Sequence, residues 1–135
     1  MELSQLLIGA ARPLETPVLL VDRLAVAAKL RQLREALPTT QFFYAVKANP
    51  HPEILAVLAA EDCGFEIASS GELELLMALG VPPCLITSSN PVKRPDFIRA
   101  ASAYGVDTFA FDSSAELRKL AELAPGSRVY LRLTV

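Results

Sequence analysis

The sequence has few of the residues that several kinds of protein site require. Its 135 residues include one histidine, two cysteines and no tryptophan. With His51 alone, the chain lacks the ligands for zinc sites of the His-x-x-x-His kind and for iron centres that use several histidines. Cys63 and Cys84 lie too far apart for a Cys-x-x-Cys motif, and two cysteines in such a chain favour a reducing compartment. We expect no metal site, and we expect both cysteines to be small buried residues.

The chain also lacks an excess of positive charge and any long apolar run. The 13 Lys and Arg residues against 15 Asp and Glu give a net charge of -2, which does not favour binding to nucleic acid or to an anionic membrane. Glu2 stands where a secretory signal requires positive charge, and no stretch approaches the about 18 apolar residues of a membrane span. We therefore expect a soluble, cytoplasmic protein with no nucleic-acid or membrane partner.

Hydrophobic residues are abundant, at 52% against 21% charged, which is typical of a folded domain. A leader over residues 1–16 precedes a stretch, 17–135, in which short β-rich runs alternate with longer helical ones. Expected strands cover residues 17–21, 42–47, 64–68, 85–87, 108–111 and 128–135. Expected helices run from an Asp22 N-cap to Leu37, over 52–60, to Gly80 after a Ser69/Glu72 capping box, over 95–104, and to Ala124 after a Ser113/Glu116 capping box.

This alternation predicts βα units and a parallel sheet, for which two architectures are available. An open dinucleotide-binding sheet would show G-x-G-x-x-G after its first strand, and the sequence has no such spacing. The alternative is a (β/α)8 barrel, which needs about 250 residues when complete. We expect an α/β fold over residues 17–135 that forms a partial (β/α)8 TIM barrel with parallel strands.

Three charged residues fall on the interior side of the expected strands. Side chains alternate across a strand, and the fully apolar face of each run should meet the helices. Lys47, Glu66 and Arg132 lie on the opposite faces, and Lys47 is the last residue of its strand, at the end where barrel active sites gather. Charges inside a barrel must be paired or used. The alternative is that they are ordinary charges at strand ends, exposed to solvent.

Several sequence segments resemble those of one protein family. Residues 44–50 (Tyr-Ala-Val-Lys-Ala-Asn-Pro) and 64–73 (Gly-Phe-Glu-Ile-Ala-Ser-Ser-Gly-Glu-Leu) resemble the pyridoxal-phosphate-dependent ornithine/diaminopimelate/arginine decarboxylases with the alanine-racemase-like barrel. Residues 90–93, 109–113 and 129–133 resemble later signatures of that family, in the same order. The resemblance covers residues 17–135.

The resemblance implies a cofactor and a set of site residues. Lys47 matches the catalytic lysine that forms a Schiff base with pyridoxal 5'-phosphate, and Glu66 and Arg132 match positions beside the cofactor. Glu66 departs from the aspartate found in many ornithine decarboxylases. The implied activity is decarboxylation of a basic amino acid such as ornithine or lysine, in polyamine biosynthesis, by an enzyme that is a homodimer at full length.

Other interpretations remain open alongside this one. A barrel of this kind also occurs in amino-acid racemases, and the chain is compatible with a non-catalytic carrier of pyridoxal phosphate or a decarboxylase-like regulatory protein. The chain resembles an N-terminal portion that lacks the family's phosphate-binding loop and C-terminal β domain, so we expect it to be inactive alone. We further expect Lys93 and Arg94 to be solvated charges, Asn49 to satisfy backbone groups in a turn, and His51 to have no catalytic role.

Overall fold

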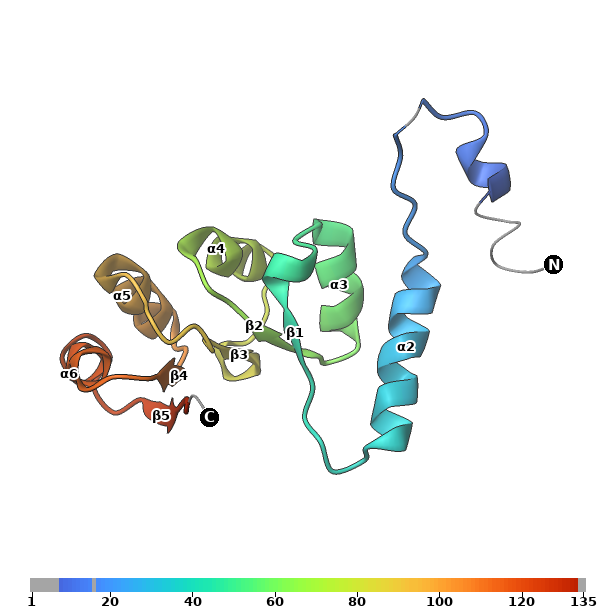
Figure 1. Ribbon diagram of the computed structural model, residues 1–135. Helices are drawn as coiled ribbons and strands as arrows, with labels where there is room; N and C mark the ends of the chain where they lie inside the picture. Colours follow the sequence, from blue (N-terminus) through green and yellow to red (C-terminus); the bar gives the residue numbers. More distant parts are fainter. Residues whose placement is uncertain (1–7, 16, 134–135) are drawn as a thin grey trace.

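The computed structural model describes residues 8–15 and 17–133 and contains alternating helices and parallel strands (Figure 1). The α-helices are α2 (Arg23–Ala36), α3 (Pro52–Ala60), α4 (Ser70–Ala78), α5 (Pro95–Tyr104) and α6 (Ser114–Leu123). The strands are β1 (Phe43–Ala45), β2 (Gly64–Glu66), β3 (Ile86–Thr87), β4 (Thr108–Phe111) and β5 (Arg128–Leu131). Two short 3-10 helices, η1 (Val46–Ala48) and η2 (Pro83–Leu85), flank β1 and β3. The division into a leader and a barrel portion stays a prediction.

The strands follow one another in chain order, all parallel. β1, β2 and β3 form one sheet in which Phe43 is opposite Gly64, and β4 and β5 form a second. An isolated parallel bridge between Ser88 and Phe109 joins the two sheets, so the five strands make one continuous arc. The helices α3, α4 and α5 lie along one side of this arc (Figure 1). A parallel arc covered by helices is part of a (β/α)8 barrel, as predicted.

The helix boundaries follow from local signals in the sequence. Asp22 accepts hydrogen bonds from the backbone N–H groups of the first turn of α2, and the Ser69 hydroxyl caps α4 by accepting from the Glu72 N–H. The Glu72 carboxylate accepts from the N–H of Ala68, one residue before the cap, at 2.6 Å. α5 ends at Gly105, whose φ of 106° is a conformation that glycine adopts without strain.

The core lies between the helices and the helix-facing side of β2 and β4. Phe65, Ile67 and Phe109 are fully buried there with residues from α3, α4 and α5. Phe65 and Ile67 make up the apolar face of the predicted strand over 64–68, so the prediction that this face meets the helices is confirmed. The apolar residues of β5 differ, since Val129 and Leu131 remain 43% and 52% exposed. Within the described residues, no helix follows β5 to cover them.

Several predicted elements are wrong in detail. Residues 17–21 form no strand, and the predicted strand over 42–47 ends at Ala45, where η1 begins. Lys47 therefore lies on a 3-10 turn just beyond the strand. The helix after Asp22 exists, but Leu24 on its expected apolar stripe is 81% exposed. The last predicted strand, 128–135, ends at Leu131, and its residues 134 and 135 lie outside the described residues.

Neither a membrane span nor a metal cluster is found in the part of the chain that the structure describes. No helix there is both long enough and apolar enough to cross a bilayer. In the same residues, no group of three or more His, Cys, Asp and Glu side chains is close enough together to hold a metal ion.

Candidate active site

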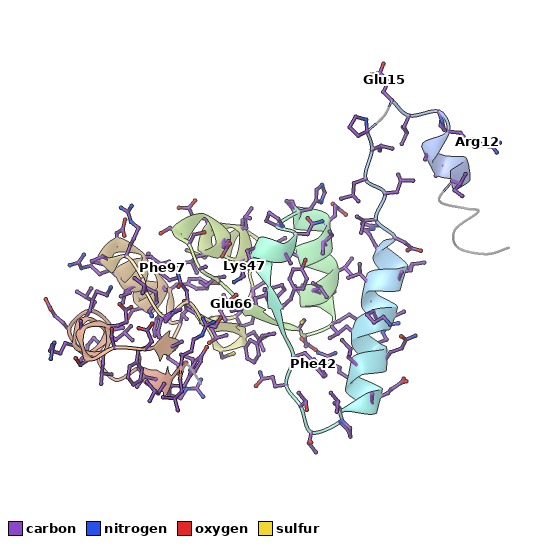
Figure 2. All side chains as sticks on the ribbon, viewed as in Figure 1. Arg12, Glu15, Phe42, Lys47, Glu66 and Phe97 are labelled. Carbon is purple, nitrogen blue, oxygen red and sulfur yellow. The ribbon has the colours of Figure 1, made fainter. Side chains whose placement is uncertain are left out.

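The carboxyl ends of the first three strands bring a lysine and a glutamate together. Glu66 is the last residue of β2, and the parallel register sets it beside Ala45 of β1 and Thr87 of β3. Lys47 follows Ala45 by two residues, on η1. Its Nζ lies 4.0 Å from Oε2 of Glu66, so the two charges that the strand faces predicted to lie inward meet at one edge of the sheet (Figure 2).

The two partners of this ion pair have different environments. The Glu66 side chain is only 8% exposed, whereas that of Lys47 is 65% exposed. The second carboxylate oxygen of Glu66 accepts a hydrogen bond from the backbone N–H of Ser89 at 3.2 Å. A carboxylate that is nearly buried needs such partners, because an unpaired charge in the interior is strongly unfavourable. Glu66 is therefore held in place, while the amine of Lys47 is accessible to a ligand.

A cavity of about 430 Å³ lies between Lys47 and the last strand. It is lined by Lys47, Ser89, Tyr130, Leu131 and Arg132. The backbone N–H of Arg132 donates to the carbonyl of Phe111 at 2.8 Å, which continues the pairing of β5 with β4 one residue beyond the strand. The structure thus places Arg132 on the same cavity as Lys47, although the two come from opposite ends of the arc.

Tyr130 is a polar residue of this cavity that no motif in the sequence singles out. Burial raises the pKa of its phenol, the nearby Glu66 charge raises it further, and the hydroxyls of Thr87 and Ser89 act in the opposite direction. The alternation of β5 puts Tyr130 on the same face as Arg132. That shared face was the signal in the sequence that could have identified it.

The segment after Lys47 is arranged largely as predicted. Asn49 accepts a hydrogen bond from the backbone N–H of His51 through its side-chain oxygen, so its role in the turn is confirmed. His51 is the N-cap of α3 and accepts from the N–H of Glu53 through Nδ1. Cys63 is buried, which raises the pKa of its thiol, but Cys84 is exposed, so the prediction of two buried cysteines is half wrong.

The prediction that Lys93 is a solvated charge is wrong. Its side chain is 0% exposed, and Nζ lies 3.0 Å from Oε1 of Glu116. Ser113 caps α6 as expected, but the Glu116 carboxylate turns to Lys93 and to Lys119 instead of completing the capping box. Hydrogen bonds between two charged groups are stronger than the one to a neutral N–H, which accounts for this choice. The neighbouring Arg94 is solvated, at 85% exposed.

A parallel α/β arc with an accessible amine and a buried carboxylate at its strand ends defines a barrel-type site for a small ligand. The family of the pyridoxal-dependent decarboxylases matches here through its pyridoxal binding domain, over residues 23–135. The chain belongs to this family.

Individual relatives agree with this assignment. A lysine/ornithine decarboxylase from Selenomonas ruminantium is 40% identical over 125 residues, which cover 93% of this chain and 32% of the relative. An ornithine decarboxylase from Schizosaccharomyces pombe is 41% identical over 113 residues, or 84% of this chain and 26% of the relative. The chain thus spans between about a quarter and a third of the length of these curated relatives.

Solved structures show the same fold. The crystal structure of lysine decarboxylase from Selenomonas ruminantium superposes with a TM-score of 0.90 at 37% identity, over 100% of this chain and 35% of that one. The structure of SrLDC in complex with PLP and cadaverine superposes with a TM-score of 0.89 at 38% identity, again over 100% and 35%. These comparisons confirm the predicted alanine-racemase-like barrel and pyridoxal phosphate as the cofactor.

The residues of the site fit that cofactor. An aldehyde requires an accessible amine, and Lys47 has one at the edge of the cavity. An aromatic ring with polar substituents requires a cavity with several hydrogen-bonding groups, and Ser89, Tyr130 and Arg132 line this one. Glu66 adds a fixed negative charge opposite the amine.

Proposed function

We propose that the full-length enzyme to which this chain belongs is a pyridoxal-phosphate-dependent decarboxylase of a basic amino acid, and that Lys47 carries the cofactor. The observation that supports this most directly is the 4.0 Å contact between Lys47 and the buried Glu66 at the carboxyl ends of parallel strands, inside the matched pyridoxal binding domain. Active sites of (β/α)8 barrels lie at this end of the strands.

Each residue of the site has a distinct role in this proposal. Lys47 binds the cofactor covalently through its ε-amine and afterwards holds or moves a proton at Nζ. Glu66 keeps a negative charge beside that amine, and Ser89 orients Glu66 through its backbone N–H. Arg132 and Tyr130 bind the polar edge of the ligand across the cavity. When bound, pyridoxal phosphate supplies an electron sink for the pair of electrons that remains when carbon dioxide leaves.

The proposed substrates are ornithine and lysine. Support comes from the relatives, whose names specify ornithine or both amino acids. We further propose that the full-length enzyme is a homodimer, as the family resemblance implies. The reducing cytoplasm is the compartment we propose for it, because Cys63 and Cys84 are free thiols.

Chemical labelling tests the assignment of Lys47. The chain is incubated with pyridoxal phosphate, reduced with borohydride and digested, and the modified peptide is identified by mass spectrometry. We expect the label on Lys47, and we expect Lys47→Ala to remove it. Lys29→Ala is the matched control, because Lys29 lies on α2 and contacts Gln32 rather than the site. A label on Lys93, or an unchanged label in Lys47→Ala, would contradict the proposal.

Decarboxylation is tested with the same variants in a chimera. This chain replaces the matching N-terminal part of the Selenomonas ruminantium lysine/ornithine decarboxylase, and release of carbon dioxide is measured with ornithine, lysine, arginine and diaminopimelate. We expect release from ornithine or lysine that depends on Lys47 and not on Lys29. A folded chimera that binds pyridoxal phosphate at Lys47 and releases no carbon dioxide from any of the four would favour a carrier.

A further inference from the structure

The loop between β3 and α5 contains a fully buried lysine that does not line the cavity beside Lys47. Lys93 has a side chain that is 0% exposed, and its ammonium meets three acceptors. Nζ donates to the carbonyl of Asn90 at 2.9 Å and to that of Ala110 at 2.6 Å, and it lies 3.0 Å from Oε1 of Glu116. An ammonium has three N–H donors, so every one of them has a partner.

The partner carboxylate is equally well satisfied. Glu116, only 4% exposed, accepts from the backbone N–H of Lys93 at 3.2 Å and pairs with the Lys119 ammonium at 2.6 Å. Burial alone would raise the pKa of Glu116, but the hydrogen bonds from Lys119 and Lys93 outweigh it and lower that pKa. Burial lowers the pKa of Lys93. A complete set of partners of this kind holds a loop rigidly, whereas an incomplete one would destabilise the fold.

This cluster fixes the loop on both sides of the residue that orients Glu66. On one side, the backbone of Ser88 forms the bridge to β4. Its N–H donates to the carbonyl of Thr108, and its carbonyl accepts from the N–H of Ala110 at 2.8 Å. On the other side, Lys93 joins the carbonyl of Asn90 to that of the same Ala110. Ser89 lies between these two anchors, and its N–H donates to the Glu66 carboxylate that faces Lys47.

We propose that Lys93 is a positioning residue of the candidate site: its buried ammonium fixes the loop at residues 88–90 so that Ser89 holds the Glu66 carboxylate opposite the Lys47 amine. The chain of contacts runs from Lys93 through Asn90 and Ser89 to Glu66. This inference rests on the proposed function of Lys47, and it extends the site to a residue that touches neither Lys47 nor the cavity.

Two single substitutions replace the Lys93 ammonium in different ways. Lys93→Arg keeps the positive charge and donors, whereas Lys93→Met removes them and leaves Glu116 with one fewer partner. Because Lys93→Met alone can unfold the chain, Lys93→Met/Glu116→Gln is made as well. It leaves no uncompensated carboxylate, and the single amide oxygen of the glutamine still accepts from the backbone N–H of residue 93, while Lys119, which is 26% exposed, turns to solvent. Arg94→Met is the matched control, since Arg94 is in the same loop but pairs only with the exposed Asp96.

The first readout is hydrogen exchange of the Ser89 amide, followed by NMR in the 135-residue chain. We expect exchange at Ser89 to become at least about threefold faster in Lys93→Met/Glu116→Gln and to stay unchanged in Arg94→Met, with Lys93→Arg close to the parent chain. Exchange in the middle of β2 reports on overall stability and should not change in proportion. Unchanged protection of Ser89 in the double variant would overturn the inference.

The second readout is the rate of borohydride-trapped labelling at Lys47. We expect the labelling rate to change by about three- to tenfold in the double variant, because the Glu66 carboxylate beside the Lys47 amine is displaced. In a Glu66→Ala background the same change should have little further effect, because the route from Lys93 to Lys47 passes through Glu66. Equal effects in both backgrounds would mean that Lys93 is merely structural and would overturn the inference. A parent chain labelled elsewhere than Lys47 would instead overturn the proposed function, while the Ser89 exchange would still decide whether Lys93 orients Glu66.

Discussion

At the scale of single residues, the close approach of β1 and β2 depends on a residue without a side chain. Gly64 begins β2 opposite Phe43, and a Cβ placed on it would lie 2.6 Å from Cδ1 of Phe43 and 3.0 Å from the carbonyl oxygen of Phe42. That carbonyl also accepts the N–H of Gly64 at 3.1 Å, so the backbone has little freedom to move away. Gly64 therefore sets the spacing of the two strands that carry Lys47 and Glu66 to the site.

Gly64→Ala should destabilise the chain. We expect a loss of about 1–3 kcal/mol in the free energy of unfolding, measured by urea denaturation, because the new methyl group overpacks the space beside Phe43. Gly71→Ala is the matched control, since a Cβ there has no neighbour within 4 Å and alanine favours the helix. If both variants were equally stable, the close approach at Gly64 would have no energetic role.

Single residues also differ in how much of their environment the sequence predicts. The inward direction of Glu66 was predictable, because strand alternation is a local rule. The burial of Lys93 was not, since its partners Ala110 and Glu116 lie 17 and 23 residues further along the chain. A lysine next to Arg94 and Pro95 has the local pattern of a solvated helix start. Only the docking of β4 and α6 over the loop distinguishes the two residues.

At the scale of elements, the short first strand explains how Lys47 reaches its partner. Strand geometry ends at Ala45, and Val46–Ala48 form a 3-10 turn in which Val46 is fully buried. The buried Val46 anchors this turn, so that the adjacent Lys47 projects from it at the strand end. The predicted strand over 42–47 missed this, because a run of aromatic and β-branched residues gives no signal for a turn. Helix α5 and strand β4 have the bounds that were predicted. For the helix, Pro95 and Gly105 mark the two ends.

Capping of α4 offers a test at this scale. Ser69→Ala removes the acceptor of the Glu72 N–H, and we expect it to lower the free energy of unfolding by about 1 kcal/mol. Ser70→Ala, one residue further into the helix, is the matched control and should change stability by less than about 0.5 kcal/mol. Urea denaturation of the three chains measures both. An equal loss in the two variants would mean that the Ser69 hydroxyl contributes nothing specific to the helix.

At the scale of the whole molecule, the arc has an exposed last strand. Val129, Tyr130, Leu131 and Leu133 are between 41% and 71% exposed, and β5 pairs only with β4 among the described strands. An unpaired strand edge with exposed apolar side chains binds further strands readily. The general architecture was predictable from the alternation of strands and helices, but this exposure was not, because it depends on what covers the arc.

We therefore expect the 135-residue chain to self-associate. We also expect it to release no carbon dioxide from ornithine at an enzymatic rate. Sedimentation velocity over a range of concentrations measures the association. Leu131→Lys should shift the chain toward monomer, because charge on an edge strand opposes pairing. Leu24→Lys is the matched control, since Leu24 is 81% exposed but lies on α2. A parent chain that is monomeric at high concentration, or that releases carbon dioxide steadily, would show this expectation to be wrong.

The isolated bridge between Ser88 and Phe109 has a mechanical consequence for the site. Glu66 belongs to the three-stranded sheet and Lys47 follows its first strand, whereas Tyr130 belongs to the pair formed by β4 and β5 and Arg132 directly follows β5. At this bridge the two sheets are joined by backbone hydrogen bonds of Ser88. Its N–H donates to the Thr108 carbonyl at 3.0 Å, and its carbonyl accepts from the Ala110 N–H at 2.8 Å. A small rotation about this junction would change the aperture between the amine and the groups facing it. A ligand that contacts both sides would then act as a brace that sets the curvature of the barrel wall.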